Sequence, residues 1–166
     1  MTGPDRTTGL GSLLDELAAA GGAYVRHGLL SAPPDPATWL EHLAPEVLAA
    51  AVAEHEAWAR VDTHVQPPTP LPQIRAGLEP VAASEATAHL TRFASTSLLW
   101  DVPSMDAGRA RDLASRVVAE LGPTARWWSN HDGYSSSYGL TGCTVDGLVA
   151  GTDGTRFGLL LQAEVD

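Results

Sequence analysis

The segment that most constrains the fold is a predicted β-hairpin over residues 143–166, CTVDGLVAGTDGTRFGLLLQAEVD. Its two arms alternate in polarity and are joined by Asp153-Gly154, a pair that favours a tight turn. Alternate residues of the second arm share one face of a strand. These residues are Phe157, Leu159, Leu161, Ala163 and Val165. An apolar strand face must be covered, so other parts of the chain must form a layer that packs on this hairpin.

A helix over residues 106–121 is the best candidate for that layer. Ser104 or Asp106 can cap its first turn, and Gly122-Pro123 is a typical helix stop. Its apolar residues recur at spacings of three and four and therefore lie on one face. They are Ala110, Leu113, Ala114, Val117 and Leu121.

The remaining segments complete an α+β pattern. β-Branched and aromatic residues predict strands over 91–102 and over ARWWSNH, residues 125–131. The first half is predicted to be helical. Its helices are indicated by the Leu10–Leu17 repeat, by Asp35 as a cap with Pro36 at the first helical position, and by a helix starting at Pro45.

We therefore predict N-terminal helices packed on a C-terminal β-α-β-β-β sheet, antiparallel or mixed. The chain is expected to form a single domain, 1–166. It would comprise a helical half (1–63), an extended proline-rich connector (64–80) and a sheet half (81–166).

The charge balance restricts the possible partners. Twenty acidic residues oppose ten basic ones, giving a formal net charge of −10. A nucleic-acid partner is not expected, because binding phosphates requires a basic surface. A basic protein partner is favoured instead. The sequence has no apolar run of about 18 residues and no signal-peptide pattern, and its single cysteine suits a reducing compartment, so we expect a cytoplasmic protein away from membranes.

Motifs that would carry chemistry are missing. The segment GTDGTRFG does not lead from a strand into a helix with a lysine, and no HExxH, CxxC or GxSxG pattern occurs. We therefore expect no cofactor, no metal and no catalytic residue. A histidine site involving His55, His64 and His131 remains open. Cys143 is expected to be a buried, inert thiol in a strand.

The aromatic segment TARWWSNHDGYSSSYGLTG, residues 124–142, is the main functional candidate. Strand alternation places Trp127 and Trp128 on opposite faces, so one should pack on the 106–121 helix. At least one tryptophan is expected to lie partly exposed, because tryptophan, tyrosine and small polar residues favour binding surfaces. Both could instead belong to the core. The predicted contact residues are Trp127, Trp128, Asn130, His131, Asp132, Tyr134 and Tyr138, with Asp146, Asp153 and Glu164 as acidic contacts.

The segment SYGLTGCTVDGLVAGTDGTRFGLLLQAEVD (137–166) resembles the end of small bacterial immunity proteins from polymorphic-toxin systems. The resemblance is carried by Tyr138 and Thr141, by the Thr144-Val145-Asp146-Gly147 strand start, and by the acidic residues Glu164 and Asp166. It implies a non-enzymatic inhibitor that occludes the active site of a cognate toxin or enzyme.

Two alternatives remain from the sequence. One is a small enzyme or small-molecule-binding domain with a pocket at the Trp127–Tyr138 loop, where Asp132 or Glu56 would hold His131 as the acid–base residue. The other is an accessory module that binds a partner through the proline-rich segment 64–80. The sequence does not indicate the oligomeric state.

Overall fold

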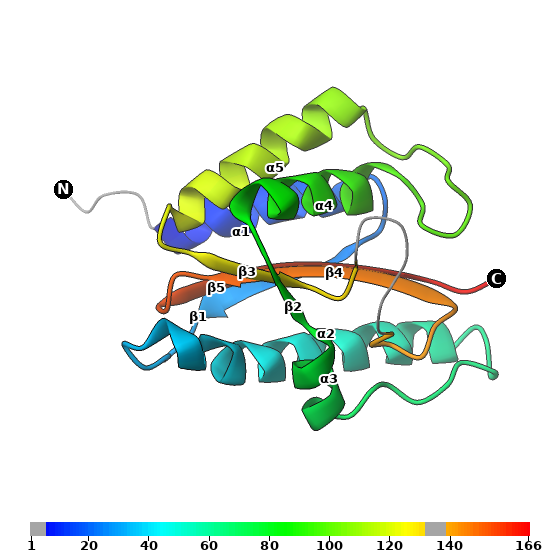
Figure 1. Cartoon of the computed structure of the whole chain (residues 1–166). Coiled ribbons are helices and arrows are strands. Elements are labelled where there is room, and N and C mark those ends of the chain that lie inside the picture. Colours follow the sequence, from blue (N-terminus) through cyan, green and yellow to red (C-terminus); the bar gives the residue numbers. More distant parts are fainter. Residues whose placement is uncertain (1–5, 132–138) are drawn as a thin grey trace.

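A computed structural model describes residues 6–131 and 139–166. In this part of the chain, helices cover both faces of a five-stranded antiparallel sheet (Figure 1). The predicted α+β class is confirmed. The strands are β1 (Tyr24–Leu29), β2 (Glu79–Val81), β3 (Arg126–Ser129), β4 (Val145–Thr152) and β5 (Arg156–Glu164). The helices are α1 (Arg6–Ala19), α2 (Trp39–Ala59), α3 (Leu71–Gly77), α4 (Ala83–Ser95) and α5 (Ala107–Leu121), with a 3-10 turn at Pro36–Thr38.

The predicted hairpin forms the centre of the sheet. The strand order is β1-β5-β4-β3-β2, and β4 pairs with β5 from Val145↔Glu164 to Thr152↔Phe157. The carboxylate of Asp153 accepts the N–H groups of Thr155 and Arg156, and this fixes the turn. The first strand closes one edge, because β1 pairs antiparallel with β5.

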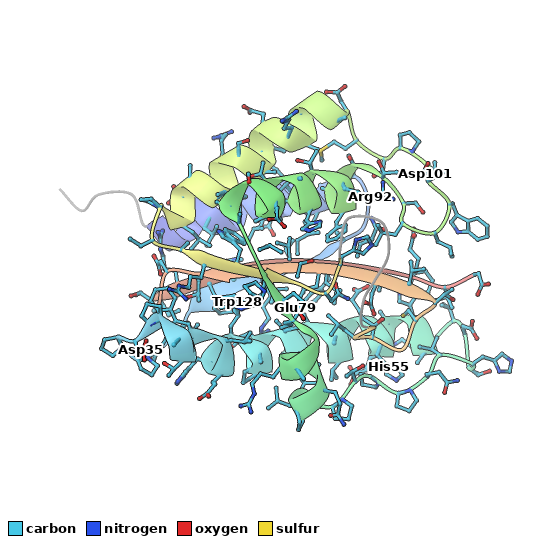
Figure 2. The ribbon with its side chains drawn as sticks, viewed as in Figure 1. Asp35, His55, Glu79, Arg92, Asp101 and Trp128 are labelled. Carbon is cyan, nitrogen blue, oxygen red and sulfur yellow. The ribbon has the colours of Figure 1, made fainter. Side chains whose placement is uncertain are left out.

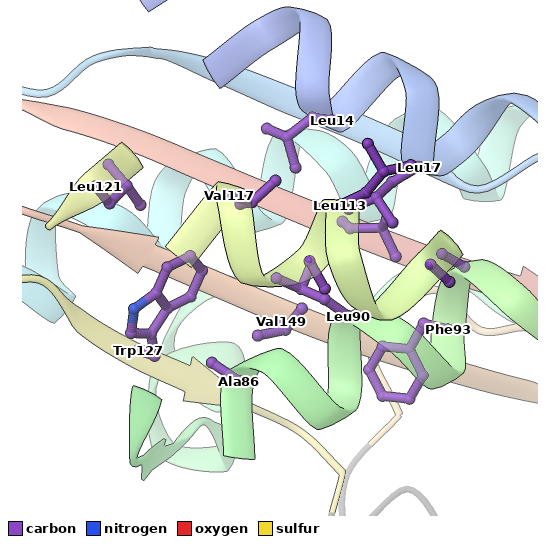
Figure 3. Close-up of a cluster of buried hydrophobic side chains, with 14 of the residues drawn as sticks. Leu14, Leu17, Ala86, Leu90, Phe93, Leu113, Val117, Leu121, Trp127 and Val149 are labelled. Carbon is purple, nitrogen blue, oxygen red and sulfur yellow. The ribbon is translucent and has the colours of Figure 1, made fainter. Parts of the chain in front are cut away.

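The upper layer in Figure 1 consists of α1, α4 and α5. The predicted apolar face of α5 is confirmed, since all five of its residues are buried. They pack with the leucines of α1, the Ala86–Phe93 face of α4, and Trp127, Val149 and Leu160 of the sheet (Figure 3). The capping prediction is also confirmed, because Asp106 accepts the N–H of Arg109 at 2.9 Å.

The lower layer consists of α2 and α3. Leu43 and Val47 of α2 and Ile74 of α3 pack against Trp128 and the other face of β4 and β5. The hairpin is therefore apolar on both faces. Leu148 points to one layer and Val149 to the other, and each is fully buried.

Several predictions of local structure were wrong. The half over residues 1–63 is not wholly helical, because it contains β1, which closes one edge of the sheet. Residues 91–102 do not form a strand, because Ala86, Leu90 and Phe93 lie one helical turn apart and bury the end of α4 in the core. The helix predicted to start at Pro45 begins at Trp39, and burial of its apolar face outweighs the hydrogen bond that the proline lacks. The proline-rich segment 64–80 is not wholly extended, since it contains α3 and most of β2.

Because α5 buries its apolar face in the core, shortening one of its buried side chains should lower the free energy of unfolding substantially. Leu113→Ala should lower the free energy of unfolding by about 2–5 kcal/mol, because it removes buried methyl groups and leaves a cavity. Urea denaturation followed by circular dichroism measures this. Ser115→Ala, on the exposed side of the same helix, should stay within about 0.5 kcal/mol of the parent protein. Equal effects of the two substitutions would contradict the packing described.

Candidate functional site

The tryptophan pair at the start of the predicted contact segment belongs to the core. Trp127 is 3% exposed under the upper layer, and Trp128 is 6% exposed above the lower layer. The predicted alternation is confirmed, and so is the packing of one tryptophan on α5. The expectation that one of them lies partly exposed is wrong, because helices cover both faces of the sheet. In the folded protein neither can serve as a partner contact.

Asn130 and Asp146 form a buried polar network instead of a contact surface. One oxygen of Asp146 accepts the Asn130 side-chain amide at 2.7 Å, and the other accepts the Leu140 N–H, the Thr141 N–H and the Thr141 hydroxyl at 2.8–2.9 Å. Asn130 in turn accepts the Leu148 N–H through its Oδ1. The buried carboxylate thus holds residues 139–144 against β3 and β4. Both residues, which were predicted to contact a partner, are therefore buried in this structure and do not lie on its surface.

His131 is also buried, beside aromatic rings of the upper layer. Its ring centroid lies 5.2 Å from that of Phe93 and 6.1 Å from that of His89. Glu56, one predicted holder of this imidazole, lies exposed on α2 in the other layer. The other holder, Asp132, and the predicted contacts Tyr134 and Tyr138 lie outside the described residues. His131 itself cannot reach a partner from its buried position.

The two remaining acidic candidates have structural roles. Asp153 fixes the β4–β5 turn, and its hydrogen bonds and the nearby Arg156 lower its pKa despite the opposing effect of burial. Glu164, at the end of β5, is half-buried and holds a loop. One of its oxygens accepts the Ser97 hydroxyl and the Leu99 N–H, both at 2.8 Å.

The loop held by Glu164 presents a tryptophan that the sequence analysis missed. Trp100 is 63% exposed, although it lies in a tightly bonded turn between α4 and α5. Its N–H donates to the Ser97 hydroxyl, and the Ser97 N–H donates to the Val102 carbonyl. The next residue, Asp101, has a φ of 54°, which is unusual outside glycine. Hydrogen bonds therefore stabilise the α4–α5 loop in this conformation, while the Trp100 side chain faces solvent.

The α4–α5 loop, with Asp101 labelled in Figure 2, lies at the end of the sheet where β5 and α2 finish (Figure 1). We call this region the end surface, and define it by Val61, Asp62, Trp100, Asp101, Val102, Glu164 and Asp166. Val61 is 76% exposed at the end of α2. Four carboxylates here outnumber the nearby positive charges, Arg60 and Arg92, and Arg92 lies 4.0 Å from Asp101.

A groove of about 460 Å³ runs into the end surface between α2 and β5. Its lining includes Glu54, Trp58, Gln162 and Glu164, and the Trp58 indole donates to the Ala163 carbonyl at 3.0 Å. Burial raises the pKa of Glu54 to about 7, although a hydrogen bond with Trp58 opposes this. This carboxyl group is therefore partly protonated near neutral pH.

The single thiol is poorly suited to nucleophilic chemistry. Cys143 is half-buried in the bend before β4, so its predicted place inside a strand is wrong. Burial raises the pKa of the thiol, a hydrogen bond with Thr141 opposes this, and the charges of Asp146 and Glu54 raise it further. The thiolate is thus disfavoured at neutral pH.

Residues 6–131 and 139–166 also bear on metal binding and on membrane insertion. No group of three or more histidine, cysteine, aspartate or glutamate side chains in these ranges could hold a metal ion. No helix there has both the length and the apolar character needed to cross a bilayer.

Comparisons of the chain with protein-family models, with curated proteins and with solved structures gave no match. Its function is therefore inferred from the chemistry of the end surface.

Fluorescence quenching distinguishes Trp100 from the core tryptophans. Acrylamide should quench the tryptophan fluorescence of the native protein measurably, and Trp100→Phe should lower the quenching constant, because Trp100 is the one exposed tryptophan of five, while Trp58 is partly buried and the other three are buried. Trp128→Phe is the matched control and should leave the quenching largely in place. An unchanged quenching constant for Trp100→Phe would show that the loop buries its indole.

The raised pKa of Glu54 predicts a pH-dependent stability. Between pH 4.5 and about 7 the folded protein keeps a proton that the unfolded chain releases, so this group lowers stability as the pH rises. Glu54→Gln should therefore be more stable than the parent protein at pH 8, and the difference should vanish towards pH 4.5. Urea denaturation at several pH values measures it. The exposed neighbour Glu56→Gln should show no such trend, and a pH-independent difference for Glu54→Gln would contradict the assignment.

Proposed function

We propose that this chain is a protein-binding inhibitor of the immunity type, which occludes the active site of a basic toxin or enzyme with its end surface. The proposal rests on one observation: Trp100 is largely exposed on a loop that hydrogen bonds hold in place. Tryptophan is the residue type most enriched among binding hot spots. A side chain already held in its bound conformation loses little entropy on binding, which strengthens association.

The charge of the end surface supports a basic partner. Asp62, Asp101, Glu164 and Asp166 lie around the exposed apolar side chains, in a chain whose net charge is −10. Carboxylates arranged around an aromatic anchor speed the encounter with a positively charged surface and disfavour other partners. An active site that binds an anionic substrate has such a surface, so the acidic groups would take the place of the substrate.

The resemblance to immunity proteins fits the same end of the molecule. Glu164 and Asp166, two acidic residues that carry the resemblance, belong to the end surface. Glu164 has a second role under this proposal, because its bonds to Ser97 and Leu99 set the position of Trp100. Asp146, which also carries the resemblance, would act indirectly by holding residues 139–144 in place.

Affinity purification with matched variants tests this proposal. Tagged parent protein should retain a basic protein from a lysate of its native host, and the same protein should be lost with Trp100→Ala. Leu29→Ala is the control, because Leu29 is 71% exposed at the opposite end of the sheet. With the purified partner, Trp100→Ala should raise the Kd at least about 30-fold, as expected for a hot-spot tryptophan.

An inhibitor must also suppress its partner. The parent protein should abolish the activity or toxicity of the captured protein in proportion to binding, and raised salt should slow the association. Retention of the partner by Trp100→Ala, or binding without loss of the partner's activity, would reject the proposal.

A further inference from the structure

A second groove lies on the upper layer, between α4 and α5 and away from the α2–β5 groove. It has a volume of about 380 Å³, within the range of small-molecule sites. Seven of its eight lining residues have polar or charged side chains, among them Thr87, Thr91, Arg92 and Arg111. These residues come from α4, from the residue that follows it, and from α5.

The charge of this lining is unusual for the molecule. Arg92 and Arg111 are two of only ten basic residues in a chain with twenty acidic ones, yet none of the carboxylates that the structure describes lines the groove. The nearby Asp101 lies 4.0 Å from Arg92 and is largely exposed, so it neutralises this guanidinium only weakly. The groove therefore brings two guanidinium groups together on an acidic protein.

Arg92 has a hydrogen-bonding atom that no described residue satisfies. Its Nε is buried without a partner within residues 6–131 and 139–166. A buried donor left without an acceptor lowers stability, so such groups normally have a partner. This Nε is not accessible from the groove, but the Arg92 side chain as a whole is 39% exposed, so a ligand would meet the other N–H groups of the guanidinium.

Two threonine hydroxyls in the groove, those of Thr87 and Thr91, indicate which groups a ligand should carry besides an anionic one. The Thr87 hydroxyl donates its proton to the Ala83 carbonyl at 3.0 Å, and the Thr91 hydroxyl donates to the Thr87 carbonyl at 2.7 Å. Each hydroxyl oxygen then has only acceptor capacity left for a ligand. A ligand with hydroxyl groups matches these acceptors.

We propose that the α4–α5 groove binds a small phosphorylated molecule that carries hydroxyl groups. Its phosphate pairs with Arg92 and Arg111, because a dianion balances two guanidinium charges and guanidinium groups bind phosphate through paired N–H donors. Its hydroxyl groups donate to Thr87 and Thr91. This site borders the end surface through the Arg92–Asp101 pair, but it does not depend on the inhibitor function proposed for that surface.

Isothermal titration calorimetry with glycerol 3-phosphate and inorganic phosphate, at constant ionic strength, tests the site. The parent protein should bind glycerol 3-phosphate saturably and more tightly than inorganic phosphate. Arg92→Gln and Arg111→Gln should each weaken binding about tenfold or more, the loss expected for a charge-assisted hydrogen bond. Arg116→Gln is the matched control, since Arg116 is exposed on α5 outside the groove, and it should bind within about twofold of the parent protein.

The results of these titrations decide whether the α4–α5 groove binds a phosphorylated ligand. Arg111 is exposed, so its substitution leaves the core intact and remains informative even if Arg92→Gln destabilises the fold. Absence of saturable binding at millimolar concentrations, or equal binding by the parent protein and Arg111→Gln, would overturn the proposal. Tighter binding of citrate than of glycerol 3-phosphate would overturn the assignment to phosphate.

Discussion

The two central strands carry apolar side chains on both faces, and most of the architecture follows from their burial. Leu148 and Leu161 face one layer of helices, while Val149 and Leu160 face the other. Each fully buried leucine or valine contributes roughly 1.5–3 kcal/mol to the free energy of unfolding. Exposing either face to water would therefore remove more stability than a small domain has. The three helices on one side and the two on the other meet this requirement.

Covering both faces leaves the ends of the sheet as the places where polar groups and irregular loops must be accommodated. At the end beyond β3 and β5, the buried Asp146 accepts the N–H groups of Leu140 and Thr141. The buried Gln162 accepts the Leu98 N–H of the α4–α5 loop and donates to the Phe93 carbonyl of α4. Such fully bonded polar groups fix one arrangement of the loops that they hold, because a shifted loop would leave buried donors unsatisfied. The exposed indole of Trp100 depends on this order, since Gln162 and Glu164 hold its loop from β5.

Elements could be predicted from the sequence where the capping and turn residues indicate the same structure as the pattern of apolar residues that face the core. The 106–121 helix and the hairpin with its Asp153-Gly154 turn have caps, turn residues and apolar faces that all indicate one structure. The error over 91–102 arose because β-branched and aromatic residues of α4 were considered without Ala86 and Leu90, which reveal the helical spacing. The site was harder to predict, because the burial of Trp127 depends on helices distant in sequence, whereas Trp100 is exposed by a short loop with no sequence pattern of its own.

The pairing of β1 with β5 has a consequence for how the chain acquires its structure during synthesis. Tyr24 and its partner Leu161 lie at opposite ends of the sequence, so one edge of the sheet cannot close until residues 156–164 have been made. The helices have local hydrogen bonds and can form earlier, but the leucine face of α1 has no complete surface to pack on until then. Nascent chains would therefore expose apolar surface until the last strand has been made, because burial of that surface depends on pairing between distant parts of the sequence.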